Sequence, residues 1–150
     1  MNNLTPEIFI AAAEHAEPWS KLRRTLWPEC PAPRHALEIQ QLLAGDGLVA
    51  LARLDNEIVG MAELSIRHDH VEGTTATPVP YLEGWFVAEH VRNRGIGRAL
   101  LKFVEDWSRS HGYHEIASDA ELHNTHSIRL HTALGFREVG RSVHFVKPLP

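Results

Sequence analysis

The stretch of residues 85–101 constrains the fold of this chain more than any other. An apolar run, Trp85-Phe86-Val87, leads into a turn rich in arginine and glycine, and apolar residues at helical spacing follow. Backbone N–H groups at the start of such a helix point outward without partners, and the helix dipole adds partial positive charge. The stretch therefore predicts a strand, an anion-binding loop and a helix in succession.

The side chains of this turn suit a pyrophosphate group. Gly95 and Gly97 carry no Cβ, so a phosphate can approach the backbone closely. Arg92, Arg94 and Arg98 place three cations around the same point. The turn is therefore predicted to bind a diphosphate, and an ordinary strand-to-helix turn with surface arginines is the alternative.

Two common nucleotide-binding loops do not fit these residues. A P-loop needs Lys-Ser or Lys-Thr after its last glycine, and neither follows Gly97. A dinucleotide fingerprint needs a third glycine where this chain has Leu100. The pattern that remains is R-x-x-G-x-G, which resembles the acetyl-CoA loop of the GNAT acyltransferases.

Length and charge limit the class of protein. The chain has 150 residues, and we expect residues 1–150 to form a single domain. Its hydrophobic fraction of 43% and charged fraction of 23% are ordinary for a soluble globule. The formal net charge of −4 argues against a nucleic-acid partner and favours a cationic small molecule.

The cysteine count and the apolar runs bear on location. Cys30 is the only cysteine, so no intrachain disulfide can form and a reducing compartment is favoured. The early apolar run at residues 8–13 is too short for a signal-peptide core or a membrane span. We therefore predict a cytoplasmic protein with no membrane partner.

The 11 histidines raise the question of a metal. His68-Asp69-His70 and the group of His123, His126 and His131 are the candidate clusters. Neither comes with the cysteine or carboxylate spacing of a recognised ligand set. We predict no metal.

Periodicity and turn residues predict helices, an antiparallel hairpin and then strands that alternate with helices. In chain order they are a strand at 8–13, helices at 19–26 and 36–43, a hairpin of 48–54 and 58–66, a strand at 81–87, a helix from 96 to Gly112, a strand at 113–118, a helix from Asn124 or Thr125 to Leu134, and a final strand or strand pair at 139–146. This order predicts a mixed α/β domain.

Five segments along the chain resemble one GNAT subfamily, the aminoglycoside 6′-N-acetyltransferases. They are Leu26-Trp27-Pro28, Ile66-Arg67-His68-Asp69, Tyr81-Leu82-Glu83-Gly84, Ala117-Ser118-Asp119 and His131-Thr132-Ala133-Leu134-Gly135-Phe136. The resemblance implies a mostly antiparallel, twisted central sheet that splays at an acyl-CoA cleft and is flanked by helices. It also implies acetylation of the 6′-amino group of an aminoglycoside antibiotic, by direct transfer from acetyl-CoA in a ternary complex. Antibiotic resistance and a homodimer are further implications.

The resemblance assigns roles at the matching positions. Residues implied to bind acetyl-CoA are Trp85, Phe86, Val87, Arg92, Asn93, Arg94, Gly95, Ile96, Gly97, Arg98 and Asn124. Residues implied to contact the aminoglycoside are Trp27, His70, Glu83, Asp119 and Glu138. The implied catalytic groups are Asp119, Glu83 and His131, and His131 stands where the family usually has a tyrosine acid.

The chemistry of the reaction agrees with these residue types. An aminoglycoside carries several ammonium groups, which carboxylates recognise. The attacking amine must lose a proton, so a base is needed, whereas no protein nucleophile is required. Two alternatives remain open: a GNAT enzyme for a polyamine or protein amine, and a non-catalytic acetyl-CoA sensor.

Overall fold

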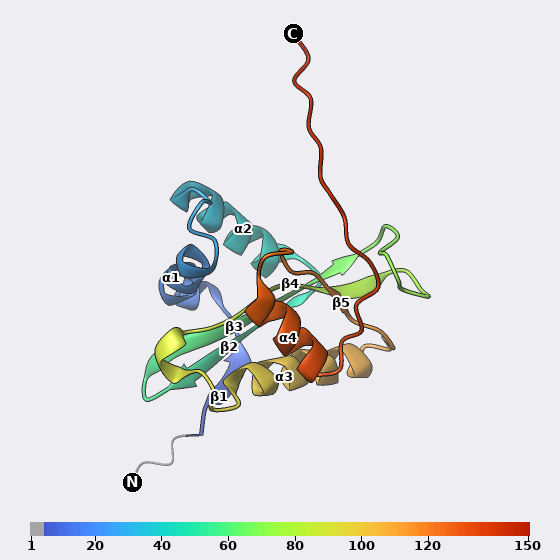
Figure 1. Ribbon diagram of the computed structural model, residues 1–150. Helices are drawn as coiled ribbons and strands as arrows, with labels where there is room; N and C mark the ends of the chain where they lie inside the picture. The colour runs from blue at the N-terminus through green and yellow to red at the C-terminus, as the bar shows by residue number, and fades with distance from the viewer. Residues whose placement is uncertain (1–4) are drawn as a thin grey trace.

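The computed structural model describes residues 5–150, which form a five-stranded sheet with helices on both faces (Figure 1). The strands lie in chain order: β1 (Glu7–Ile10), β2 (Leu48–Leu54), β3 (Glu57–Arg67), β4 (Val79–Val87) and β5 (Ala117–Ser118). The first four pair antiparallel, and β5 pairs with β4 in parallel. The predicted mixed α/β fold with a mostly antiparallel sheet is confirmed.

The hairpin of β2 and β3 forms at the predicted turn. Asp55 and Asn56 have φ of 52° and 63°, the left-handed conformation that a two-residue type I′ turn requires. Short polar residues tolerate this region better than other non-glycine residues. The turn therefore sets the register in which β2 pairs with β3.

Two helices, α1 (Ala16–Leu26) and α2 (Ala32–Ala44), cover one face of the sheet. Their apolar residues pack on this face in a cluster that includes Trp19, Leu51 and Met61. Both helices begin earlier than predicted because Pro18 and Pro33 lie inside the first turn, where the missing N–H costs nothing.

The helix α3 (Ile96–Ser110) covers the opposite face, as its apolar stripe predicts. Leu100 and Val104 are fully buried there against apolar side chains of β2 and β3. Two short 3₁₀ turns, η1 (Ala13–His15) and η2 (Glu89–Val91), precede α1 and α3. Within residues 5–150, no helix combines the length and the apolar character that a membrane span needs.

The last helix, α4 (Thr125–Ala133), has the predicted boundaries. The side chain of Asn124 caps it by accepting a hydrogen bond from the Ser127 N–H at 3.1 Å. Gly135 follows with φ of 99°, the left-handed conformation that ends a helix. The preceding strand is shorter than predicted, since only Ala117 and Ser118 pair with β4.

The predicted strand at 139–146 is wrong for the single chain. Residues 137–150 have no secondary structure; Val139 and Gly140 lie against Gly73 and Glu72 of the β3–β4 loop, and the end of the chain then runs away from the body of the molecule (Figure 1). A strand needs a neighbour for its backbone hydrogen bonds, and the tail lies beside none in this chain.

Candidate active site

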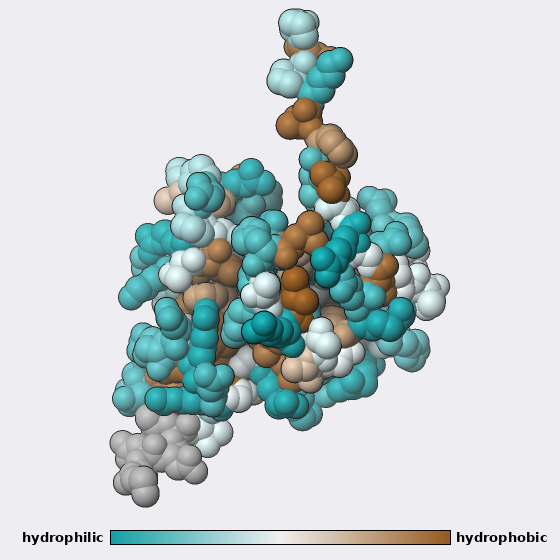
Figure 2. All heavy atoms as spheres, in the orientation of Figure 1, coloured by the Kyte–Doolittle hydropathy of each residue, from teal (hydrophilic) through white to brown (hydrophobic). Residues whose placement is uncertain are grey.

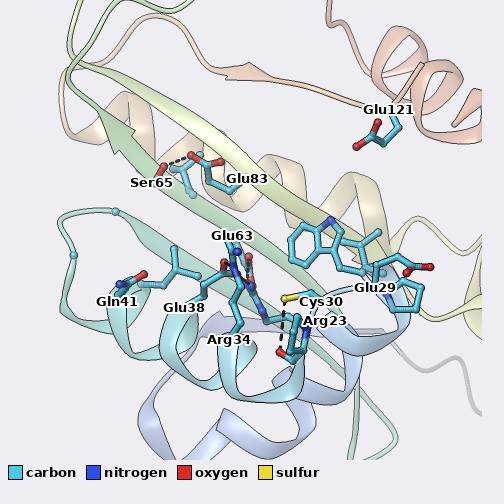
Figure 3. A pocket seen from close by; sticks show the side chains of 18 of the residues that line it. Arg23, Glu29, Cys30, Arg34, Glu38, Gln41, Glu63, Ser65, Glu83 and Glu121 are labelled. Carbon is cyan, nitrogen blue, oxygen red and sulfur yellow. Dashed lines mark hydrogen bonds and ion pairs between the residues drawn. The ribbon is translucent and has the colours of Figure 1, made fainter. Parts of the chain in front are cut away.

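A pocket of about 1180 Å³ opens on the face of the sheet that carries α1 and α2. Its walls come from the end of α1, one side of α2 and the turn after it, the strands β3 and β4, and the loop before α4. Figure 3 shows Glu83 and Ser65 on the two strands, with Glu121 reaching in from that loop. The pocket brings together two predicted acceptor residues, Trp27 and Glu83.

A β-bulge in β4 directs Glu83 into this pocket. Glu63 pairs with Gly84 but Leu64 pairs with Leu82, so Glu83 is one residue too many for the ladder. Glu83 and Gly84 consequently face the same side of the sheet, toward α1 and α2. Trp85 returns to the opposite face, where it packs against the α3 cluster.

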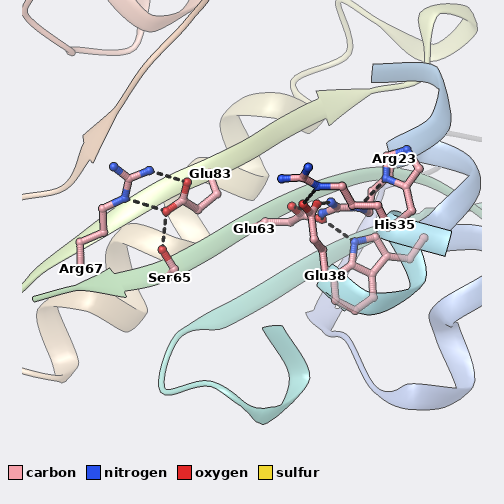
Figure 4. A network of polar contacts seen from close by, with 9 residues as sticks. Arg23, His35, Glu38, Glu63, Ser65, Arg67 and Glu83 are labelled. Carbon is pink, nitrogen blue, oxygen red and sulfur yellow. Dashed lines mark hydrogen bonds and ion pairs between the residues drawn. The ribbon is translucent and has the colours of Figure 1, made fainter. Parts of the chain in front are cut away.

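Three hydrogen bonds hold the Glu83 carboxylate. The Ser65 hydroxyl donates to it at 2.6 Å, and the guanidinium of Arg67 donates at 2.9 Å and 2.8 Å (Figure 4). These bonds raise the pKa of Arg67. Because a carboxylate offers about four acceptor positions, Glu83 has room for one further donor from the pocket.

Asp119 lies outside the lining of the pocket but is linked to it. The Arg67 guanidinium carbon lies 3.4 Å from the ring centroid of Tyr81, and the Tyr81 hydroxyl donates a hydrogen bond to Asp119. Burial, and then the Asp119 carboxylate, raise the pKa of Tyr81. A chain of polar contacts therefore connects exposed Asp119 with Glu83 through Tyr81 and Arg67.

Beneath the pocket lies a buried ion pair that the sequence analysis did not identify. Arg23 Nη1 donates to both carboxylate oxygens of Glu63 at 2.6 Å, and Trp19 Nε1 donates to Glu63 at 2.7 Å. Arg23 also donates to His35 Nδ1 at 3.1 Å and to Glu38 (Figure 4). Burial raises the pKa of Glu63, while the Arg23 charge opposes this. The alternation from Ala62 to Arg67 in β3 is the sequence signal that places Glu63 on this face.

Further carboxylates line the pocket from irregular segments. Glu29 follows α1, Asp46 follows α2, and Glu121 precedes α4. Among the described residues, Glu29 and Glu121 have no side-chain hydrogen bond or ion pair, whereas Asp46 lies 3.3 Å from His68 Nε2. No periodicity marks these positions, so the sequence gives no signal for their convergence.

Two predicted acceptor residues lie away from the pocket lining. His70 is exposed in the loop between β3 and β4. Glu138 is exposed at the start of the tail, where Arg141 donates to it at 2.5 Å and lowers its pKa. Their roles in binding an acceptor stay predictions.

The arginine- and glycine-rich loop has the predicted strand-to-helix setting. Gly95 caps α3 with φ of 80°, and a Cβ there would meet nothing within 4 Å. Arg94 and Arg98 are exposed, whereas Ile96 is buried in the core, so only its backbone faces the loop. Arg92 Nε donates to the Val87 carbonyl at 2.9 Å, which ties the loop to the end of β4.

The second half of β4 has one unpaired edge. β5 pairs only with Tyr81 and Leu82, so within residues 5–150 no strand pairs with Trp85, Phe86 and Val87 on that side, where the Val87 carbonyl accepts from Arg92. Such an edge can hydrogen-bond an extended ligand in the manner of a strand. This edge lies between the arginine- and glycine-rich loop and the residues of β4 that pair with β5.

His131 lies at the point where β5 leaves β4. Its Nδ1 lies 2.7 Å from the Ser127 carbonyl oxygen, so Nδ1 carries a proton and donates there. Its Nε2 lies 2.8 Å from the Ser118 hydroxyl, which is 3.2 Å from the Leu82 carbonyl oxygen. The ring also packs edge-on against Trp85 at 5.2 Å between centroids.

Cys30, His35 and Glu38 bring a thiol, a ring nitrogen and a carboxylate within 4.8 Å of one another. Arg23 donates to His35 and to Glu38, so these two side chains already accept hydrogen bonds from a cation. His35 and Glu38 therefore belong to the hydrogen-bond network of Arg23, whereas the Cys30 thiol donates to the Pro31 carbonyl at 3.8 Å.

Comparison with known proteins agrees with this geometry. The profile of the Acetyltransferase (GNAT) family matches residues 12–136. The chain is 42% identical over 145 residues to the aminoglycoside N(6′)-acetyltransferase type 1 of Stenotrophomonas maltophilia, covering 96% of this chain and 94% of the relative. It is 40% identical to the protein of the same name from Salmonella enteritidis, covering 89% and 92%.

Solved structures show the same likeness. A structure of the aminoglycoside N-acetyltransferase AAC(6′)-Iy in complex with CoA superposes with a TM-score of 0.91 at 36% identity, covering 99% of this chain and 98% of that one. Another structure of AAC(6′)-Iy, in complex with the bisubstrate analogue CoA-S-monomethyl-acetylneamine, superposes with a TM-score of 0.90 at 36% identity. The match covers 97% of this chain and 99% of that one.

Proposed function

The chain belongs to the GNAT acetyltransferase family, and on this premise we propose that it acetylates the 6′-amino group of aminoglycoside antibiotics, conferring resistance. Acetyl-CoA is the donor, because a relative of the same fold was solved with CoA. The observation that carries the proposal is the carboxylate-lined pocket beside the open edge of β4. Its carboxylates suit a polycationic acceptor.

The proposed donor site follows the loop and the open edge of β4. The unpaired N–H groups at the start of α3, with the arginines of the loop, would receive the pyrophosphate. The backbone of Trp85, Phe86 and Val87 would pair with the pantetheine arm. Asn124 already caps α4, so it would contact the cofactor from the start of that helix.

In the proposed reaction the 6′-amine attacks the thioester carbonyl carbon, a C–N bond forms, and the C–S bond then breaks. Glu83 accepts the proton that the amine loses, because it is the predicted catalytic carboxylate that lines the pocket. Backbone N–H groups at the open edge of β4 stabilise the developing oxyanion. The departing thiolate takes up a proton and leaves as CoA.

We propose that His131 supplies this last proton. In its protonated form Nδ1 donates to the Ser127 carbonyl, while Nε2 donates to Ser118, whose hydroxyl then donates to Leu82. Transfer to the thiolate then runs through Ser118, whose hydroxyl gives its proton to the thiolate and takes one from Nε2. The His131→Gln variant should therefore lower kcat more than it changes the KM of acetyl-CoA.

The test of the function is thiol release from acetyl-CoA with kanamycin, tobramycin and spermidine as separate acceptors. We expect turnover with the two aminoglycosides and none with an aminoglycoside lacking the 6′-amine. Turnover with spermidine alone would replace the proposal with a polyamine acetyltransferase. Binding of acetyl-CoA without turnover of any amine would point to a sensor.

We further propose that the protein is a homodimer in which the tail of one copy lies on the other. Phe145 and Val146 are 91% and 94% exposed, and Figure 2 shows hydrophobic side chains along the projecting tail. Unpaired backbone and exposed apolar side chains are the features by which a strand joins another sheet. Light scattering should give twice the chain mass for the wild type and a monomer for Phe145→Asp/Val146→Asp. A wild-type monomer would refute this assembly.

A cytoplasmic location completes the proposal. The single cysteine, Cys30, is a free thiol, which suits a reducing compartment. Fractionation of cells expressing the protein should recover the acetyltransferase activity with cytoplasmic markers.

A further inference from the structure

We infer that Gly84 and the buried Arg23–Glu63 pair are positioning residues that fix the indole of Trp27 as one wall of the acceptor pocket. The inference rests on the proposed function only in taking this pocket as the acceptor site. Trp27 ends α1, and its ring lines the pocket beside the strand that carries Glu83. The place of this ring therefore decides how an acceptor lies against the Glu83 carboxylate.

Gly84 makes the space that the indole fills. A Cβ at this position would lie 2.6 Å from Cη2 and 3.3 Å from Cζ2 of Trp27, and 3.1 Å from Oε1 of Glu63. Gly84 pairs with Glu63 directly beside the bulge, and its φ lies outside the left-handed region. Space rather than backbone conformation therefore requires glycine here.

Arg23 holds the face of the same ring. Its guanidinium carbon lies 4.8 Å from the centroid of Trp27, within the range of a cation–π contact. The ring of His35 lies nearly parallel to Trp27, with 6.5 Å between centroids and an interplanar angle of 21°. The Trp27 ring is thus fixed at its edge by β4 and contacted on its face by Arg23.

Glu63 in turn fixes Arg23. The side chains of Arg23 and Glu63 are 2% and 1% exposed, and their two 2.6 Å contacts admit little freedom. The planar guanidinium is oriented further because Nη2 donates to Glu38 and Nε donates to His35. Trp19 donates to the second oxygen of Glu63 from α1, so the pair is anchored to both the helix and the sheet.

The energetics of the pair favour a positioning role over a stabilising one. A buried ion pair is often no more stabilising than apolar residues of similar volume, because both charges lose their water. The network also leaves His35 Nε2 buried without a partner among the described residues. The network contains two cations, Arg23 and Arg34, and two anions, Glu38 and Glu63. Its charges therefore balance, and it does not repel a cationic acceptor in the pocket.

The test is a double-mutant cycle of Gly84→Ala and Trp27→Phe. In the wild-type background Gly84→Ala should lower kcat/KM for an aminoglycoside by about tenfold or more, since displacement of a site by ~1 Å can cost ~100-fold. The KM of acetyl-CoA should stay unchanged. Phenylalanine has no Cη2, so Gly84→Ala should have little added effect in the Trp27→Phe background. Equal effects in both backgrounds, or an equal change in the KM of acetyl-CoA, would overturn the inference.

A second readout needs no activity. The indole N–H resonance of Trp27 can be identified by its loss in Trp27→Phe, and it should shift in Gly84→Ala and in Glu63→Gln. An unmoved resonance in Gly84→Ala overturns the inference whatever the acceptor is. Absence of aminoglycoside turnover in the wild type would instead refute the proposed function, while the resonance would still test the inference.

Discussion

The two faces of the sheet are built on different principles. The face under α3 is apolar throughout, with Ala62, Leu64 and Leu100 fully buried. The face under α1 and α2 is apolar only near β1 and β2, and further along β3 it carries Glu63, Ser65 and Arg67. The comparison indicates that one face supplies stability, while the other gives up apolar burial to hold a pocket.

The largest expected effect tests this division through stability. Glu63→Ala leaves the Arg23 charge buried without its partner, which should cost about 3–5 kcal/mol of unfolding free energy. Arg23→Met/Glu63→Leu removes both charges and should recover most of that loss. Denaturant unfolding measures the unfolding free energy of both variants. Leu100→Ala on the α3 face is the control, because its loss of stability comes from a cavity and not from an unpaired charge. A double variant as unstable as Glu63→Ala would show that the pair is itself a source of stability.

The next effect separates the acceptor side from the donor side. Glu83→Gln keeps the shape but removes the base, so kcat/KM for an aminoglycoside should fall about 10²- to 10⁴-fold. Arg92→Ala is the matched control on the loop and should raise chiefly the KM of acetyl-CoA. Steady-state kinetics with each substrate varied in turn separates the two effects. Loss of acetyl-CoA affinity in Glu83→Gln would contradict the assignment of Glu83 to the acceptor side.

A smaller effect is expected at Asp119. It reaches Glu83 only through Tyr81 and Arg67, so Asp119→Asn should lower kcat by about tenfold, or ~1.4 kcal/mol of activation free energy. Tyr81→Phe breaks the same link and should have a similar effect. If Asp119→Asn lowered kcat more than Glu83→Gln does, Asp119 rather than Glu83 would be the base.

The smallest expected effect is on stability, at Glu115, which lies before β5 and outside both faces of the sheet. The backbone N–H and hydroxyl of Thr75 donate to Glu115 at 2.8 Å and hold its pKa below the usual value. The contribution of Glu115 to stability is therefore present above about pH 4.3, the unfolded value, and is lost as pH falls through the folded pKa. Glu115→Gln should lower Tm by less than about 3 °C at pH 7, with the difference shrinking in acid. A difference that persists at low pH would exclude this charge effect.

Much of the fold could be predicted because local patterns determine it. The Asp55-Asn56 turn, the stripe of α3 and the cap at Asn124 each depend on residues near in sequence. The tail at 139–146 has the composition of a strand, yet no partner strand in the chain lies beside it. Local pattern cannot reveal where a partner strand comes from.

The candidate site was predictable only in part, for a similar reason. Resemblance identified Trp27 and Glu83, and both lie in the pocket. Arg23 and Glu63 are 40 residues apart in sequence, and no local signal pairs them. The approach of Glu121 to the pocket likewise depends on how the loop before α4 folds back.

The bulge at Glu83 has a consequence for how such a protein can change over time. By adding one residue, it places Glu83 and Gly84 on the acceptor side while Trp85 keeps its place on the other. Under the proposed function, a substitution at 83 or 84 acts on the acceptor pocket and leaves the side chains from Trp85 onward on the other face in place. A single extra residue thus separates the positions where a change would affect the proposed acceptor site from those where it would affect the proposed cofactor site.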